Sequence, residues 1–313
     1  SRDYLFKGNN FHDGWHYGMT RKDYYELQEG KQHNISSEIT IDDIVQVICS
    51  VLVDEDVDKK VKEAINNGQL STLNSWEEVE LSKKLISLHP WADMARYARS
   101  GGEACAVAIR IARAASGKDK VAFCGYHGWH DWYLAANISD PSNLDQQLLE
   151  GLNPKGVPNV LGGTAIPFNY NKINELKIII KNNPDEIGVI IMEVERSNDP
   201  EEGFLENIRS IADKINATLI FDEITSGFKT NLGGVHMKYN IEPDIAIFGK
   251  ALGNGYPIAA IIGRKEFMDV AQDSFISSTF WTERIGPSAA LKTLEVMEEL
   301  QSWEIITEKG MLI

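Results

Sequence analysis

Short, continuous apolar segments alternate with amphipathic ones along the chain from residue 54 onward. The apolar segments span residues 94–98, 120–124, 187–192, 217–222, 244–250 and 258–263. Segments of this length are typical of the buried strands of a parallel sheet. Between them, apolar residues recur at helical spacing over residues 57–66, 76–88, 104–115, 173–181, 208–215 and 287–300. This alternation predicts an α/β fold with a mostly parallel central sheet flanked by helices.

Two neighbouring apolar segments end in side chains of opposite charge, Asp222 and Lys250. Because ligands bind beyond the carboxyl ends of parallel strands, we expect both side chains at one edge of the sheet. A lysine amine can form a Schiff base with an aldehyde, and pyridoxal phosphate (PLP) needs such a lysine together with an acid for its pyridine nitrogen. A buried Asp–Lys ion pair, or two unrelated residues at strand ends, would account for the pattern equally well.

The segment Ser100-Gly101-Gly102-Glu103 lies between a predicted strand and a predicted helix. Backbone N–H groups at a helix start point at an anion, and glycine lets a phosphate approach closely. The spacing matches neither a P-loop nor a dinucleotide-binding fingerprint. The segment therefore predicts either a phosphate site or a tight turn without a ligand.

An aromatic segment, residues 126–133, follows the strand predicted at 120–124. Tyr126, at the strand end, could stack on a flat cofactor. His127, His130 and Asp131 could suggest a metal site, but the glycine and tryptophans between them fit a stacking wall better. We therefore expect no metal at this position.

Composition excludes several classes of function. The 313 residues are 43% hydrophobic and 25% charged, as in an ordinary globular protein, and the net charge of −15 argues against nucleic-acid binding. No apolar run is long enough to cross a membrane. The three cysteines form no clustered pattern, which favours reduced thiols and a cytoplasmic location.

Taken in order, these motifs resemble those of class III aminotransferases, which are fold-type I PLP enzymes, and most closely those of the glutamate-1-semialdehyde aminomutase-like branch. The motifs are Ser100-Gly101-Gly102-Glu103, Tyr126-His127-Gly128, residues 222–228 from Asp222 to Phe228, Gly249-Lys250 and Ser278-Thr279. The resemblance covers roughly residues 54–313. It implies that Lys250 forms the Schiff base and that Asp222 contacts the pyridine nitrogen.

The resemblance also implies the remaining contacts to the cofactor. Tyr126 would stack on one face of the ring and Ile224 would pack on the other. Ser100, Gly101 and Gly102 would bind the phosphate. Thr279 would reach the phosphate held by a neighbouring subunit, so the enzyme would be a homodimer with shared active sites.

The resemblance is weaker at both ends of the chain. Residues 1–52 do not match the family's N-terminal signature and form a segment of unclear class. Residues 53–313 would form the PLP-binding large domain, expected to be truncated because the family's C-terminal small domain is missing from the sequence. We expect an aminotransferase that acts on small-molecule amines and carbonyl compounds. A PLP-dependent 2,1-aminomutase or a non-catalytic PLP-fold subunit remain as alternatives.

Overall fold

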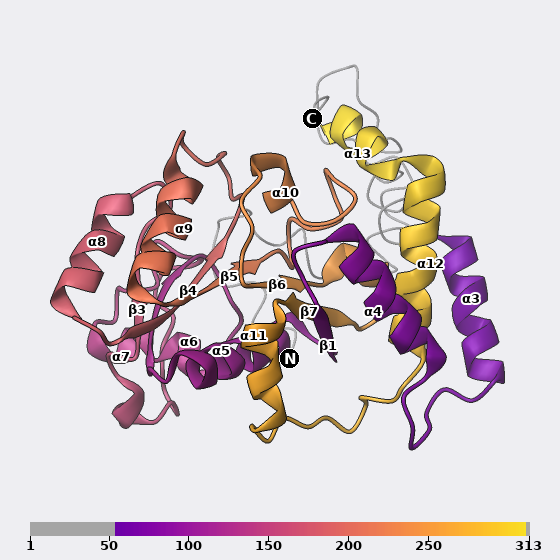
Figure 1. Ribbon diagram of the computed structural model, residues 1–313, viewed down its shortest axis with the longest axis horizontal. Helices are drawn as coiled ribbons and strands as arrows, with labels where there is room; N and C mark the ends of the chain where they lie inside the picture. Colours follow the sequence, from indigo (N-terminus) through magenta and orange to yellow (C-terminus); the bar gives the residue numbers. More distant parts are fainter. Residues whose placement is uncertain (1–53, 311–313) are drawn as a thin grey trace, which may run out of the picture.

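The computed structural model describes residues 54–310, so the predicted N-terminal segment 1–52 lies outside the described residues. The described chain forms one sheet with helices on both sides (Figure 1). The strands are β1 (Met94–Ala98), β2 (Lys120–Cys124), β3 (Ala165–Pro167), β4 (Ile187–Glu193), β5 (Thr218–Asp222), β6 (Ile245–Phe248) and β7 (Ala259–Gly263). The α-helices are α3 (Glu55–Asn66), α4 (Trp76–Leu88), α5 (Gly101–Ser116), α6 (Asp131–Leu134), α7 (Ala136–Ser139), α8 (Ile173–Asn182), α9 (Phe204–Ile215), α10 (His236–Tyr239), α11 (Lys265–Met268), α12 (Ile285–Leu300) and α13 (Ser302–Gly310). Short 3₁₀ turns are η3 (Asn159–Leu161), η4 (Lys250–Gly253) and η5 (Asp269–Gln272).

The sheet has seven strands in the order β1-β7-β6-β5-β4-β2-β3. The strands from β6 to β3 are parallel to one another, whereas β7 runs antiparallel to both β6 and β1. The predicted α/β fold with a mostly parallel sheet is therefore confirmed. Asp222 pairs with Glu193 of β4 on one side and with Ile247 of β6 on the other. This register brings the ends of β4, β5 and β6 to the same edge, as expected for Asp222 and Lys250.

The helices cover the two faces of the sheet in separate groups. Helix α5 crosses one face, where its buried Ala104, Ala108 and Ile111 join side chains from most of the strands. On the other face, α8 and α9 cover the β2-β4-β5 end, while α4 and α12 cover the β1-β7-β6 end (Figure 1). Small residues along α5 let this helix lie close to the strands, so its N-terminus is held against the sheet edge that carries the polar side chains.

Helix α4 follows the predicted pattern except at one position. Ser75 caps its start by accepting a hydrogen bond from the backbone N–H of Glu78, at 3.3 Å. Leu81 and Leu85 are buried, as their helical spacing indicates, but Val79 is 46% exposed. Glu77 is buried instead of Val79, because its carboxylate forms an ion pair with Arg284, with Nη2 and Oε1 2.5 Å apart. The sequence pattern could not reveal this, because the partner lies far along the chain.

Candidate active site

A cavity of about 310 Å³ opens at the edge of the sheet where β5 and β6 end. Its lining includes every site residue expected from the sequence except Thr279: Ser100, Gly101, Gly102, Tyr126, Asp222, Ile224 and Lys250. These residues come from the start of α5, the loop after β2, the end of β5 and the turn after β6. The fold thus brings together segments that are widely separated in the sequence.

Asp222 lies at the bottom of this cavity and is only 4% exposed. Its Oδ2 accepts a hydrogen bond from His127 Nδ1 at 2.7 Å and another from the Cys105 thiol at 3.3 Å. The backbone N–H of Ile224 donates to Oδ1 at 3.1 Å. These three hydrogen bonds fix the orientation of the Asp222 carboxylate in the cavity.

His127 forms one of these hydrogen bonds to Asp222 and has a second partner. Its Nε2 lies 3.2 Å from the backbone oxygen of Cys124, which can only accept a hydrogen bond. The ring is therefore fixed between the Cys124 backbone and the Asp222 carboxylate. The His127 ring is buried, pairs with Asp222 and stacks on Trp132, with ring centres 6.2 Å apart; the pairing with Asp222 was not predicted from the sequence.

Lys250 follows β6 as the first residue of η4, and its amine projects into the cavity. Its Nζ donates a hydrogen bond to Thr225 Oγ1 at 2.8 Å. Partial burial lowers the pKa of the Lys250 amine, while the charges of Asp222 and Glu193 act in the opposite direction. A lowered pKa makes the neutral, nucleophilic form of a lysine amine more accessible.

The start of α5 forms a concave surface on the same cavity. Ser100 caps the helix by accepting from the backbone N–H of Glu103, at 3.4 Å. A Cβ added at Gly101 would lie 2.8 Å from Ile224 Cδ1, and one added at Gly102 would lie 2.8 Å from His130 Nδ1. Since the first N–H groups of a helix have no intrahelical partner, this surface offers donors to an anion.

Comparison with known proteins identifies the family of this chain. Residues 46–313 match the family "Aminotransferase class-III". The chain belongs to the class-III aminotransferases. It is 36% identical over 271 residues to a 3-aminobutyryl-CoA aminotransferase of Cloacimonas acidaminovorans, covering 84% of this chain and 61% of that protein. It is 34% identical to a glutamate-1-semialdehyde 2,1-aminomutase of Ignicoccus hospitalis, covering 78% of this chain and 59% of that protein.

Solved structures show the same fold. An omega-transaminase from Sphaerobacter thermophilus superimposes with a TM-score of 0.70 at 23% identity, covering 81% of this chain and 61% of that chain. A transaminase solved with PLP bound gives a TM-score of 0.70 at 21% identity, covering 80% of this chain and 62% of that chain. These matches establish the fold-type I architecture of this class-III chain. The chain spans about three-fifths of the length of the curated relatives that it matches.

The cavity of this class-III chain fits a cofactor that carries a phosphate. The Nδ1 atom of His130 is buried without a hydrogen-bond partner among the described residues, and it faces the helix start at Gly102. An anion seated on the first turn of α5 would supply that partner. The sequence pattern suggested His130 only as a metal ligand or part of a wall, so this contact was missed.

Two predicted contacts occupy different positions relative to the cavity. Tyr126 is 39% exposed at the cavity, and its backbone N–H donates to Glu193 Oε2 at 3.2 Å. Burial raises the pKa of the Glu193 carboxyl, whereas the charges of His127 and Arg196 oppose this effect. Thr279 is exposed and does not line the cavity of its own chain. Its predicted role therefore depends on a second subunit.

Proposed function

We propose that this chain is the catalytic part of a PLP-dependent aminotransferase that moves an amino group between an amine or amino-acid donor and a carbonyl acceptor. The observation that carries the proposal is the convergence of the Lys250 amine, the Asp222 carboxylate and the glycine-rich start of α5 on one cavity. The class-III family membership supports the same assignment. No helix of the described residues is long and apolar enough to span a membrane.

Each group in the cavity has a distinct task in this proposal. Ser100, Gly101 and Gly102 hold the phosphate of PLP, which when bound supplies a ring that accepts electrons from the substrate carbon. Asp222 would hold the pyridine nitrogen, where its negative charge would favour the protonated ring. Lys250 would hold the aldehyde carbon through its amine and would carry the proton to and from the substrate carbon.

The remaining walls orient the ring. Ile224 lies between Gly101 and Gly249, with side-chain atoms 2.8 and 3.5 Å from the Cβ positions that these glycines lack. Its apolar side chain would cover one face of the ring, and Tyr126 would stack on the other. A ring held between two side chains is fixed in orientation while Lys250 reaches its reactive carbon.

The assignment of Lys250 is tested by chemical labelling. Borohydride reduction of the full-length enzyme with PLP, followed by peptide mapping, should place the cofactor on Lys250. Lys250→Ala should fold but lose the visible absorbance of the lysine-bound cofactor. Lys229 is a matched control, because its pKa is also lowered, first by partial loss of solvent and then by the nearby charge of Lys250. Lys229→Ala should keep the label on Lys250, and a label found on any other lysine would contradict the proposal.

An aminomutase is the second candidate function, since curated relatives at 34% identity are glutamate-1-semialdehyde 2,1-aminomutases. Such an enzyme would use the same residues but keep the amine and the carbonyl on one molecule. Incubating full-length enzyme with an amino compound and no separate carbonyl acceptor distinguishes the two. Formation of an isomer supports the mutase, while net transfer to a second molecule supports the aminotransferase. A cofactor colour that persists across a broad donor panel would instead indicate a non-catalytic PLP-fold subunit.

We propose a homodimer in which Thr279 of each subunit completes the phosphate site of the other. Residues 53–313 would be the PLP-binding large domain, and residues 1–52 a separate segment. Cys105 and Cys124 are buried free thiols, which is compatible with a reducing, cytoplasmic location.

A further inference from the structure

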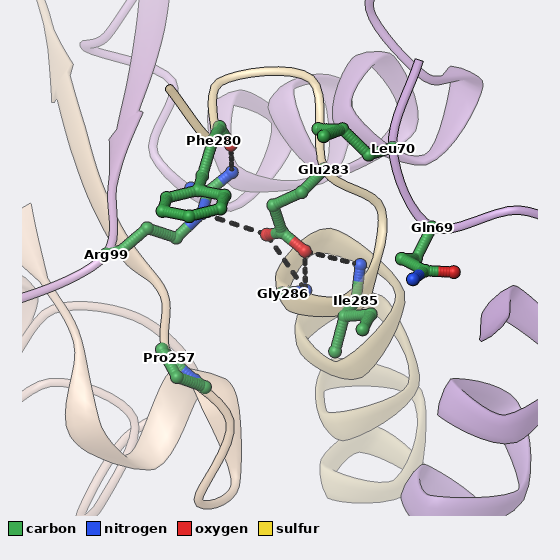
Figure 2. A pocket seen from close by; sticks show the side chains of 8 residues that line it. All are labelled: Gln69, Leu70, Arg99, Pro257, Phe280, Glu283, Ile285 and Gly286. Carbon is green, nitrogen blue, oxygen red and sulfur yellow. Dashed lines mark hydrogen bonds and ion pairs between the residues drawn. The ribbon is translucent and has the colours of Figure 1, made fainter. Parts of the chain in front are cut away.

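A second cavity, of about 460 Å³, adjoins the candidate active site (Figure 2). Its walls are mostly apolar and include Leu70, Phe280 and Ile285. Arg99 and Pro257 line both cavities, so they form the shared wall. Arg99 directly precedes Ser100, the first residue of the proposed phosphate site. Phe280 directly follows Thr279.

Arg99 connects this wall to the segment that carries Thr279. Its Nε lies 2.9 Å from Glu283 Oε1, and both side chains are largely buried, at 14% and 13% exposure. Its Nη2 donates to the backbone oxygen of Phe280 at 2.5 Å, and its Nη1 donates to that of Ala98 at 3.1 Å. Figure 2 shows the guanidinium between Phe280 and Glu283. One side chain therefore ties the end of β1 to the backbone next to Thr279.

Glu283 is held from the other side by the start of α12. Its Oε2 accepts from the backbone N–H of Ile285 at 2.7 Å, and its Oε1 accepts from that of Gly286 at 3.1 Å. The carboxylate thus bridges a helix N-terminus and the Arg99 guanidinium, both of which favour negative charge. Because the pair is largely buried, removing one partner leaves the other charge uncompensated.

We propose that Arg99 and Glu283 are positioning residues, which hold residues 277–284 beside the phosphate site so that Thr279 is presented to the cofactor phosphate of the partner subunit. This inference rests on the proposed dimer with shared sites. Other contacts anchor the segment further along: the Arg96 guanidinium lies 5.5 Å from the centre of the Trp281 ring, Thr282 Oγ1 donates to the backbone oxygen of Ser71, and the Arg284 side chain pairs with Glu77. Next to Thr279, the backbone N–H of Phe280 donates to Ser278 Oγ at 3.4 Å within the segment, whereas the Arg99 bond to the Phe280 oxygen ties that backbone to the end of β1.

A double-mutant cycle on the full-length apoenzyme tests the proposal, with the PLP dissociation constant as the readout. Thr279→Val should weaken PLP binding by about 10- to 100-fold, the value of a hydrogen bond to a charged group. Glu283→Gln should weaken it by about 2- to 100-fold, but no more than Thr279→Val does. Because Glu283 acts through Thr279, the double variant should bind PLP no more weakly than Thr279→Val alone.

A second variant and a control separate positioning from stability. Arg99→Lys keeps the positive charge but cannot bond Glu283, Phe280 and Ala98 together, so it should weaken PLP binding and show the same non-additivity with Thr279→Val. Asp244→Asn removes one partner of another largely buried pair, Arg209–Asp244 at 3.0 Å, at the far end of β6 from Lys250. It should lower the melting temperature without changing PLP affinity.

Three outcomes would overturn the inference. Additive effects of Glu283→Gln and Thr279→Val would mean that the ion pair acts through the phosphate site of its own subunit. A lowered melting temperature with unchanged PLP affinity in Glu283→Gln would mean a purely structural role. Unchanged affinity in Thr279→Val would remove the shared-site basis. The labelling of Lys250 reports separately on the proposed function, so its success or failure is distinguishable from these results.

Discussion

At the scale of single residues, Lys250 shows how the fold constrains its chemistry. Its backbone is left-handed, with a φ of 46°, a conformation that costs an L-residue about 1–2 kcal/mol. The strand before it and the η4 turn after it hold this conformation. Strain of this kind persists where the surrounding structure over-determines a functional side chain. At Lys250, the left-handed backbone directs the side-chain amine into the cavity that Asp222 also lines.

The fully buried His89 predicts a pH dependence of stability. His89 Nδ1 donates to the backbone oxygen of Leu85 at 2.8 Å, and its Nε2 accepts from the backbone N–H of Gly234 at 2.9 Å, so the ring is neutral. Burial lowers the pKa of His89 to about 4. The charge of His236 acts in the same direction, while the charge of Glu223 and the bond to Leu85 oppose it.

Because the unfolded chain binds a proton on His89 near pH 6.5 and the folded chain does not, acid favours unfolding. This contribution to stability is present above pH 6.5 and is lost as the pH falls towards 4, by on the order of 3 kcal/mol. His89→Gln can keep both hydrogen bonds without titrating. Denaturant unfolding between pH 7 and 4 should show a steeper loss for wild type than for His89→Gln, and parallel curves would contradict the prediction.

At the scale of elements, the site depends on close approach of the 126–129 loop to the start of α5. Gly128 has a φ of 92°, and a Cβ there would lie 2.6 Å from the Gly102 Cα. The two glycines therefore let a loop and a helix start touch backbone to backbone. This contact positions the loop that carries Tyr126 at the cavity and His127 against Asp222, so a change in the position of the loop would alter the site.

Gly128→Ala should disrupt this contact. The positive φ and the clash with backbone together should cost about 2 kcal/mol or more, lowering the melting temperature and weakening PLP binding. Gly156→Ala is a matched control, because its φ is 98° but nothing lies within 4 Å of the added Cβ. It should show the backbone strain alone and leave PLP affinity unchanged. Equal effects of the two substitutions on PLP affinity would refute the role of the contact.

At the scale of the whole molecule, the proposed shared site makes the dimer the unit of activity. Lys250→Ala and Thr279→Val should each impair full-length homodimers. In a hybrid dimer of these two variants, donation of Thr279 across the interface places both lesions in one site and leaves the other intact. Activity should return to at most about half of the wild-type value per dimer. If subunit exchange is demonstrated and no activity returns, Thr279 does not serve the partner.

Local sequence patterns determined much of this architecture. The strands at 94–98 and 120–124, the helix start at Gly101-Gly102, and the placement of Asp222 and Lys250 at one sheet edge were predicted and lie as expected. Such features follow from the spacing of apolar residues and from the backbone preferences of glycine, which act over a few residues. These features can therefore be predicted without knowing which distant residues come into contact.

Only the tertiary structure decided which side chains support the predicted ones. His127 lies 95 positions before Asp222 in the sequence, and its burial against that carboxylate depends on β2, β4 and β5 lying side by side. The pairing of Arg99 with Glu283 likewise depends on the placement of α12 beside the end of β1. The antiparallel direction of β7 is set by the short connection from η4, not by its apolar composition. Long-range pairs leave no local periodicity, because sheet order and helix packing choose the partner after each element has formed.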